Sequence, residues 1–240
     1  MLVVFLKYIY NIFLIYLFGM GKKGLKRMKN SSKSKKAIVY ENLKNRIINN
    51  SLTPGEPLSE GILSEDLKTS KTPIREALQQ LEKGGFVENI PGRGSFVSTI
   101  SIQDIREIFE IREILECEVV KRAALKSNPD EVESIKKKFE TESNGDKNSG
   151  DHFRAGDRIH TFVFECIGNK RLLEYYKRLQ EHIIRMRLNF FSELHQDRFE
   201  QSFKEHIEIM DALIAQDPLR AEKAMRDHLR NATEYLKKII

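Results

Sequence analysis

Three histidines lie on apolar faces of predicted helices in the C-terminal half of this 240-residue chain: His160, His206 and His228. Aromatic and aliphatic residues recur three, four and seven positions away from each, which indicates the core-facing side of a helix. Asp157 lies three residues before His160 on the same face. Imidazole nitrogens and a carboxylate can bind one divalent cation between helices, so these four residues are a candidate site for zinc, nickel or manganese. The alternative is that they are hydrogen-bonded core histidines, because no short motif such as H-E-x-x-H is present.

Two charges interrupt the apolar stripe of another predicted helix in this half. Arg112 and Glu116 are four residues apart among Ile105, Phe109 and Val119. The two side chains can pair with each other at a helix interface, or Arg112 can point into a cavity and bind an anionic ligand.

A further set of polar residues, in the N-terminal half, is suited to contacting DNA. Ser70, Lys71, Thr72 and Arg75 occupy the first turns of a predicted helix, and Arg93 lies in a glycine-rich turn. A helix N-terminus in a major groove offers amides to phosphate and an arginine to guanine, whereas Lys71 would neutralise a phosphate. Arg93 would reach the DNA backbone or the minor groove. Taken singly, each of these residues is more often a solvated surface residue, and the prediction rests on their combination with a glycine-rich wing.

The elements that would position these residues divide the chain into two predicted domains. Residues 36–100 show three helical segments and two short alternating segments around Pro91-Gly92-Arg93-Gly94, which predicts a winged helix-turn-helix. Strand signals are absent from residues 101–240, where loop signals separate about six helices. The expected fold is therefore mainly α, with an N-terminal winged helix-turn-helix followed by an all-α helical-bundle ligand domain. The two cysteines show no metal-site spacing, which favours a reducing, cytoplasmic setting.

Residues 1–35 form an apolar and then basic extension. Nine basic residues and no acidic residue precede residue 37, so residues 37–240 carry a net charge of −3 against +6 for the whole chain. The basic pI therefore gives no argument for nucleic-acid binding by the folded part. Residues 1–19 are long enough to span a bilayer. They are interpreted as a membrane anchor, a signal peptide without a typical cleavage site, or upstream sequence translated from an early start.

Several motifs of the N-terminal half resemble the GntR family of bacterial transcription regulators. They are LTPGEPL at 52–58, LKTSKTPIREAL at 67–78, LEKGGFV at 81–87 and PGRGSFV at 91–97. The resemblance implies DNA contacts by Ser70, Lys71, Thr72, Arg75 and the wing residue Gly92. Lys71 stands where the family usually has arginine, which keeps the charge but loses bidentate geometry.

The C-terminal half resembles the helical, FCD-type effector domain of the FadR-like branch, on the residues around Arg112, His160, His206 and His228. In that branch the domain commonly holds a metal through one aspartate and three histidines, and small carboxylates ligate the metal or lie beside it. The family's acid lies four residues before the first histidine, where this chain has Gly156. Either Asp157 ligates instead, or the site has three histidines. Arg112 matches a family arginine that faces the effector pocket.

The function expected from this sequence is sequence-specific transcription regulation with no catalytic residues. The resemblance implies a cytoplasmic homodimer, more often a repressor, that binds double-stranded DNA at an inverted-repeat operator and responds to a small organic acid. One alternative is a membrane-tethered regulator of the same type, which requires residues 1–19 to be a translated anchor. The other is a metal-dependent hydrolase or lyase, which is disfavoured because no general base or nucleophile accompanies the candidate ligands.

Overall fold

The computed structural model describes residues 34–144, 149–190 and 196–239 of the chain. The predicted extension at residues 1–35 lies almost wholly outside the described residues, as do all three interpretations of residues 1–19. No helix in the described ranges combines the length and the apolar character that a membrane span needs.

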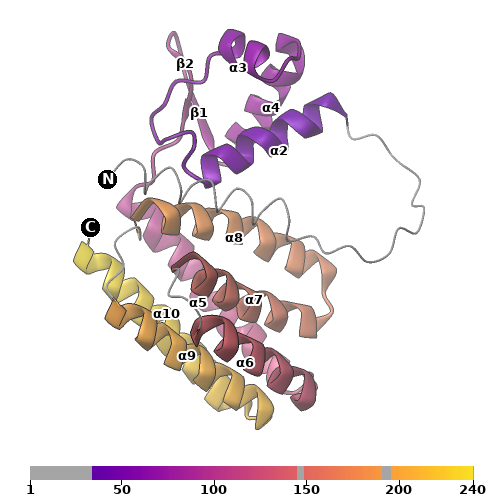
Figure 1. Cartoon of the computed structure of the whole chain (residues 1–240), viewed down its shortest axis with the longest axis vertical. Helices are drawn as coiled ribbons and strands as arrows, with labels where there is room; N and C mark the ends of the chain where they lie inside the picture. The colour runs from indigo at the N-terminus through magenta and orange to yellow at the C-terminus, as the bar shows by residue number, and fades with distance from the viewer. Residues whose placement is uncertain (1–33, 145–148, 191–195, 240) are drawn as a thin grey trace. The chain divides into compact units, whose positions relative to one another are not determined.

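Three helices and a two-stranded hairpin form the N-terminal part of the described chain (Figure 1). The elements are α2 (Lys35–Ile48), α3 (Glu60–Asp66), α4 (Lys71–Lys83), β1 (Val87–Ile90) and β2 (Gly94–Val97). The strands pair antiparallel, from Val87 opposite Val97 to Ile90 opposite Gly94. The turn between them needs Gly92, whose φ of 74° favours glycine. This arrangement is the predicted winged helix-turn-helix.

One apolar core holds these elements together. Leu43 of α2 and both Ile74 and Leu81 of α4 are completely buried. Phe86 and Val97 bring the hairpin onto the same cluster. Because Ile74 and Leu81 are seven residues apart, they lie on one face of α4 and leave the opposite face exposed.

Six helices follow in the described residues, and the prediction of an all-α region with about six helices is confirmed. They are α5 (Ile102–Ala124), α6 (Pro129–Asn144), α7 (Ser149–Ile167), α8 (Lys170–Phe190), α9 (Gln196–Ile214) and α10 (Pro218–Ile239). Short-range signals set several of their boundaries. Ser101 and Asp104 form a reciprocal capping box at the start of α5. The Asp217 side chain accepts hydrogen bonds from the backbone N–H groups of Leu219 and Arg220 at the start of α10.

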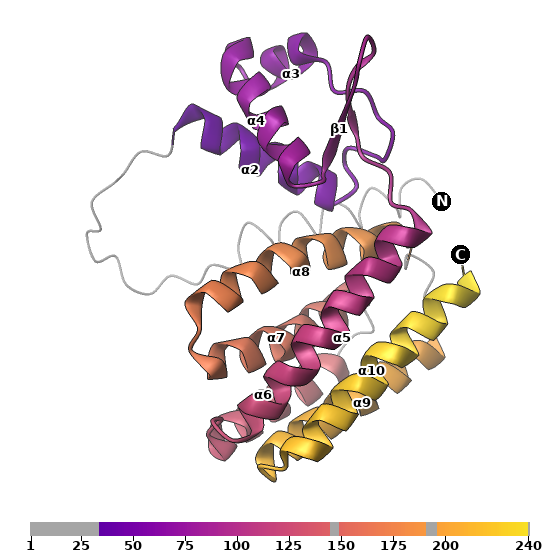
Figure 2. The ribbon, with the colours of Figure 1, turned by 180° about the vertical axis from the view of Figure 1, so that it is seen from behind.

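The helices pack side by side around a second core. In both views α9 and α10 lie next to each other, and α5 packs against α10 (Figures 1 and 2). α5 also contacts α7 and α9, which brings the inner faces of α5, α7, α9 and α10 together. Each predicted metal-ligating histidine is on one of these inner faces.

α8 has neighbours on two sides. It packs against α7 within the bundle and against α2 of the winged helix-turn-helix. Lys44 of α2 donates to Glu181 of α8 at 2.7 Å, and the guanidinium of Arg185 donates to the hydroxyl of Ser98 at 2.8 Å. His182 stacks on Phe86 with ring centroids 4.5 Å apart.

Candidate functional site

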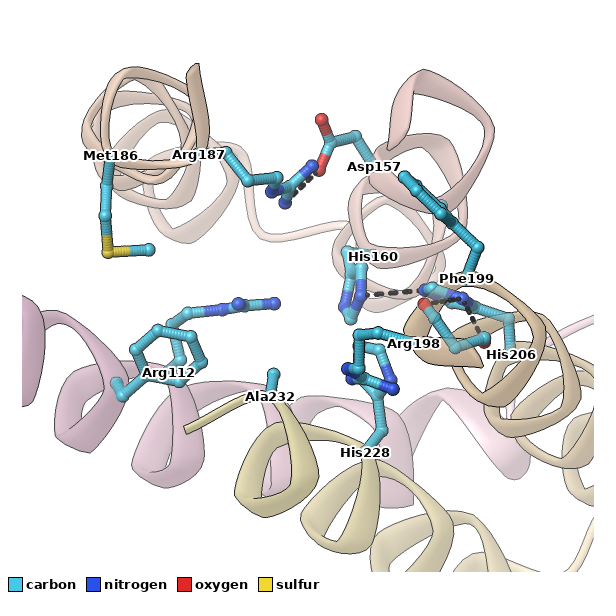
Figure 3. Close-up of a pocket in the computed structure, with 13 residues that line it drawn as sticks. Arg112, Asp157, His160, Met186, Arg187, Arg198, Phe199, His206, His228 and Ala232 are labelled. Carbon is cyan, nitrogen blue, oxygen red and sulfur yellow. Dashed lines mark hydrogen bonds and ion pairs between the residues drawn. The ribbon is translucent and has the colours of Figure 1, made fainter. Parts of the chain in front are cut away.

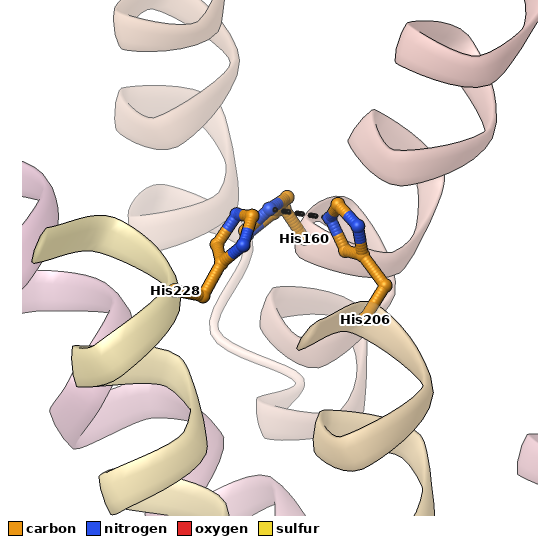
Figure 4. A group of neighbouring side chains, drawn as sticks. All are labelled: His160, His206 and His228. Atoms are coloured by element: carbon orange, nitrogen blue, oxygen red, sulfur yellow. Dashed lines mark hydrogen bonds between the residues drawn. The ribbon is translucent and has the colours of Figure 1, made fainter. Parts of the chain in front are cut away.

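Three histidine side chains from three helices meet in the interior of the bundle (Figure 4). His160 comes from α7, His206 from α9 and His228 from α10, and each is at most 5% exposed. One potential ligand nitrogen from each lies within 4.8 Å of the others. The predicted convergence of these residues is therefore present in the structure.

The Nδ1 atom of each histidine faces an oxygen acceptor. His206 Nδ1 donates to the backbone carbonyl of Ser202 at 2.8 Å, and His228 Nδ1 lies 2.7 Å from Glu205 Oε2. His160 Nδ1 lies 2.6 Å from Glu116 Oε2, and neither atom has a hydrogen bond elsewhere. An acceptor opposite Nδ1 keeps the proton there and leaves Nε2 unprotonated, which is how outer-shell groups orient metal-binding imidazoles.

The resulting arrangement of Nε2 atoms fits a cation. His160 Nε2 and His206 Nε2 are 3.3 Å apart (Figure 4). Two unprotonated nitrogens at that distance direct lone pairs at each other, which is unfavourable unless a cation or a proton lies between them. Burial holds the pKa of His228 well below its usual value, which favours the neutral form that a metal requires.

Arg112 and Glu116 pair with each other, which is the first of the two alternatives considered for them, and the binding of an anion by Arg112 stays a prediction. Arg112 Nε donates to Glu116 Oε1 at 2.6 Å, and the two side chains are 4% and 0% exposed. Although burial opposes ionisation, Arg112 and His160 lower the pKa of Glu116 to about 2. Arg112 also lines a cavity beside the histidines. The Glu116 carboxylate thus orients the His160 ring through Nδ1, and the Arg112 guanidinium borders the cavity.

The cavity lies directly beside the histidine cluster and has a free volume of about 60 Å³ (Figure 3). Phe109, Met186 and Phe199 form apolar parts of its wall, and Arg187 and Arg198 border it as well. Sequence reasoning missed both arginines. For Arg198 a signal was available, because it lies eight residues before His206 and so near the same face of α9.

Asp157 lines the same cavity as the three histidines, but its carboxylate does not join their group of ligand atoms. Its carboxylate accepts from Arg187 at 2.7 Å, and the described group of mutually close ligand atoms holds only the three imidazoles. Of the two possibilities considered for this chain, the structure therefore presents the three-histidine arrangement. His182, a further histidine on an apolar stripe, stacks on Phe86 and lies outside this group.

Gly156 is in close contact with the cluster. A Cβ atom at this position would lie 2.9 Å from Cε1 and 3.0 Å from Nε2 of His206. Real Cβ atoms do not approach other atoms so closely, so the ring of His206 occupies space that any other residue at 156 would need. The absence of a side chain here is part of how the three rings fit together.

The predicted DNA-contacting residues lie on the exposed side of the winged helix-turn-helix. Ser70, Lys71, Thr72 and Arg75 are all exposed around the first turns of α4, which begins at Lys71. Ser70 occupies the N-cap position without a side-chain cap, so its hydroxyl is not engaged in capping. Arg75 makes a two-point contact with Glu60 of α3, with N–O distances of 2.8 Å. The four residues are thus exposed at the start of α4, and Arg75 links them to Glu60 of α3.

The wing presents the remaining predicted contacts. Gly92 and Arg93 are exposed in the turn between β1 and β2. The Arg93 guanidinium lies 5.4 Å from the ring centroid of Phe96, close enough for a cation–π contact. That contact restricts where the arginine at the tip can point.

Two protein families match this chain over almost all of its described length. The FCD domain family matches residues 107–231, more than half of the chain, and the family of bacterial regulatory proteins named gntR matches residues 35–97. This chain is a GntR family regulator with an FCD domain. The resemblance inferred from the sequence motifs is thereby confirmed.

Named relatives agree with this assignment. The regulator is 28% identical over 203 residues to the HTH-type transcriptional repressor RspR of Escherichia coli, covering 84% of this chain and 88% of that protein. It is 27% identical over 198 residues to the repressor GlaR of the same organism, covering 79% and 90%.

Solved structures show the same fold. The regulator aligns with Escherichia coli McbR/YncC at a TM-score of 0.68 and 20% identity, over 85% of this chain and 98% of that one. A putative GntR regulator from Rhodococcus sp. RHA1 aligns at 0.70 and 21%, over 86% and 99%.

The family assignment decides between the classes of function. GntR family members and the named relatives are DNA-binding transcriptional regulators, so this protein is a regulator and not an enzyme. The hydrolase or lyase alternative is rejected on that ground. The histidine cluster therefore has to be explained as part of a regulatory domain.

Proposed function

We propose that this regulator is a homodimeric, cytoplasmic repressor whose affinity for an inverted-repeat operator is changed by a small organic acid bound beside a divalent cation in the FCD domain. The observation that carries the proposal is the set of three imidazoles whose Nδ1 atoms are each opposite an oxygen acceptor, at the edge of a cavity bordered by arginines.

DNA binding is assigned to the exposed face of α4 and to the wing. Lys71, Thr72 and Arg75 would enter a major groove, and Gly92 and Arg93 would approach the backbone or the minor groove. Two copies are proposed because a dimer places two such helices in successive major grooves. Repression is supported by the names of the relatives RspR and GlaR.

The metal is assigned to His160, His206 and His228 through Nε2. A bound divalent cation would supply a Lewis-acidic centre that attracts an oxygen of an anionic ligand. Carboxylate oxygens suit the arginines on the same wall, because guanidinium groups bind carboxylates with charge-assisted hydrogen bonds. The cavity beside the histidines, of about 60 Å³, suits a small effector.

Metal content tests the site directly. Elemental analysis of protein purified without added metal or chelator should find about one divalent ion per chain. His206→Ala and the milder His206→Gln should both lose it, since each removes a ligand nitrogen. His182→Ala is the matched control, because that histidine lies on α8 outside the cluster, and it should keep the ion. Full occupancy in both His206 variants would refute the three-histidine site.

Operator binding tests the remaining proposal. Selection of bound duplexes from a random pool should enrich an inverted repeat. Small organic acids should change the affinity for that repeat in the metal-loaded protein and leave it unchanged in His206→Gln. A response that persists in His206→Gln would place the effector elsewhere.

A further inference from the structure

Two side chains of α8, three residues apart, hold the winged helix-turn-helix against the FCD domain. The His182 ring stacks on Phe86, with the ring planes 8° from parallel and the centroids 4.5 Å apart. Arg185 donates to both the hydroxyl and the backbone carbonyl of Ser98. Because residues three apart lie on the same side of a helix, the two contacts act together. We call His182 and Arg185 the α8 latch.

The residues that the α8 latch contacts lie where α4 joins the wing. Gly84 is the C-cap of α4, Phe86 follows two positions later, and Ser98 comes directly after β2. The backbone N–H of Ser98 donates to the backbone carbonyl of Phe86 at 3.1 Å, so the two contacted segments are bonded to each other. While the latch is closed, the C-terminal end of α4 is therefore held on the helical bundle.

The closed latch buries a positive charge without an ion pair. Arg185 is 3% exposed, its guanidinium bonds to neutral groups of Ser98, and its Nε atom has no hydrogen-bond partner in the described part of the chain. Asp104 of α5 acts on this charge only from a distance, because its carboxylate accepts from Ser101. Burying a charge in this way costs free energy, so a further positive charge at the latch would oppose its closure.

A proton on His182 would supply such a charge. The ring is half-buried on Phe86, and the Arg185 guanidinium lies 5.9 Å from the centroid of the same Phe86 ring. Burial and the charge of Arg185 lower the pKa of His182. Three groups around the ring favour its protonated form: Glu181 on α8, Asp104 on α5 and the backbone of Gly84 at the end of α4. They do not prevail, since Glu181 already accepts from Lys44 of α2 at 2.7 Å.

We infer that the α8 latch responds to protons: a neutral His182 holds the winged helix-turn-helix on the FCD domain, and protonation of its ring releases it. A histidine pKa that is lower in the closed than in the released state means that the closed state binds fewer protons. Closure is therefore fully favoured above the ordinary histidine pKa of about 6.5 and is weakened as the pH falls below that value. Release would free the end of α4 from the bundle.

The test measures a distance between the two domains in the full-length protein, about one pH unit above and one below 6.5. Spin labels are attached through Glu65→Cys on α3 and Lys177→Cys on α8, which are both exposed positions, and Cys117→Ala and Cys166→Ser remove the native thiols. Dilution with unlabelled chains keeps distances between copies out of the measurement. Double electron–electron resonance should give one narrow distance distribution at the higher pH and a broader one at the lower pH.

Two variants remove the ionisable group from the latch. His182→Phe keeps a ring to stack on Phe86, so its distribution should stay narrow at both pH values. His182→Gln has no such ring, and its distribution should be the same at both pH values whatever its width. His206→Gln is the matched control, because it removes a histidine of α9 that lies outside the latch, and it should broaden at the lower pH as the wild type does.

Three results would overturn the inference. The first is a wild-type distribution that does not change between the two pH values. The second is a broadening that persists in both His182→Phe and His182→Gln, because another group would then control the contact. The third is the loss of the broadening in His206→Gln, which would assign the response to the histidine cluster. None of these distances depends on the effector, so failure of the latch would leave the proposed function standing.

Discussion

Gly156→Ala tests the geometry of the histidine cluster with the addition of one methyl group. Its Cβ atom would lie 2.9 Å from Cε1 of His206, whereas carbon atoms in favourable contact are about 3.5–4.0 Å apart. The ring must therefore retreat by roughly 0.6–1.1 Å to restore contact distance. Metal–ligand distances tolerate changes of only about 0.2 Å. The substitution should displace one of the three ligand nitrogens from its working position.

The expected magnitude follows from two opposing effects. Replacing glycine by alanine inside a helix stabilises by about 1 kcal/mol, whereas overpacking a buried site costs about 1–3 kcal/mol. The free energy of unfolding of metal-free protein should then fall by no more than about 2 kcal/mol. Metal affinity should fall about 10–100-fold, the range seen when ligand orientation is disturbed.

Gly61→Ala is the matched control for this substitution. Gly61 also lies in a helix, α3, but the nearest atom to its Cβ would be Ser59 Oγ at an ordinary 3.7 Å. This variant should gain stability in urea denaturation and bind Zn²⁺ like the wild type in chelator competition. Gly156→Ala protein that binds Zn²⁺ as tightly as the wild type would refute the argument that the ring of His206 needs the space at Gly156.

Three further predictions concern other parts of the molecule. Arg75→Ala should abolish operator preference in the selection assay while circular dichroism shows unchanged helix content; retained preference would exclude Arg75 from base recognition. Glu116→Gln should lower the free energy of unfolding, measured in urea, by about 3–5 kcal/mol, because it leaves Arg112 as a buried charge without its partner. A loss below about 1 kcal/mol is the usual size for an exposed ion pair, and it would contradict the burial of the Arg112–Glu116 pair. Burial raises the pKa of Cys117 and of Cys166 to about 11, so only about one thiol in a thousand is ionised at pH 8. Native protein should therefore react with iodoacetamide far more slowly than urea-unfolded protein. Equal reaction rates would contradict the burial of these thiols.

Much of the fold was predictable from local signals. The apolar spacing of Ile74 and Leu81, the glycines of the wing and the loop signals between helices correspond to the observed helices and hairpin. These signals act between residues close in sequence, where periodicity and turn chemistry decide the structure. The convergence of His160, His206 and His228 was predictable for a related reason, since a histidine on an apolar helix face must point into the core.

The details of the site depended on contacts that local spacing does not specify. One residue corresponds to about 100° of rotation around a helix, which separates the direction of Asp157 from that of Gly156. Glu205 is adjacent to His206 in sequence, yet it accepts from His228 of another helix. Arg187 borders the cavity because of how α8 is rotated against α7. The relative rotation and register of neighbouring helices decide each of these contacts.

The pairing of Arg75 with Glu60 has a consequence for how the protein would search along DNA. In the free protein Glu60 engages this guanidinium at two points, so its charge adds little to the attraction that any phosphate backbone exerts. If Arg75 contacts a base as proposed, that contact would be an exchange of partners, in which a carboxylate with two acceptors is replaced by a base edge with two acceptors. Guanine offers such an edge in the major groove through N7 and O6. A sequence without it leaves Arg75 on Glu60, and the protein remains free to move on.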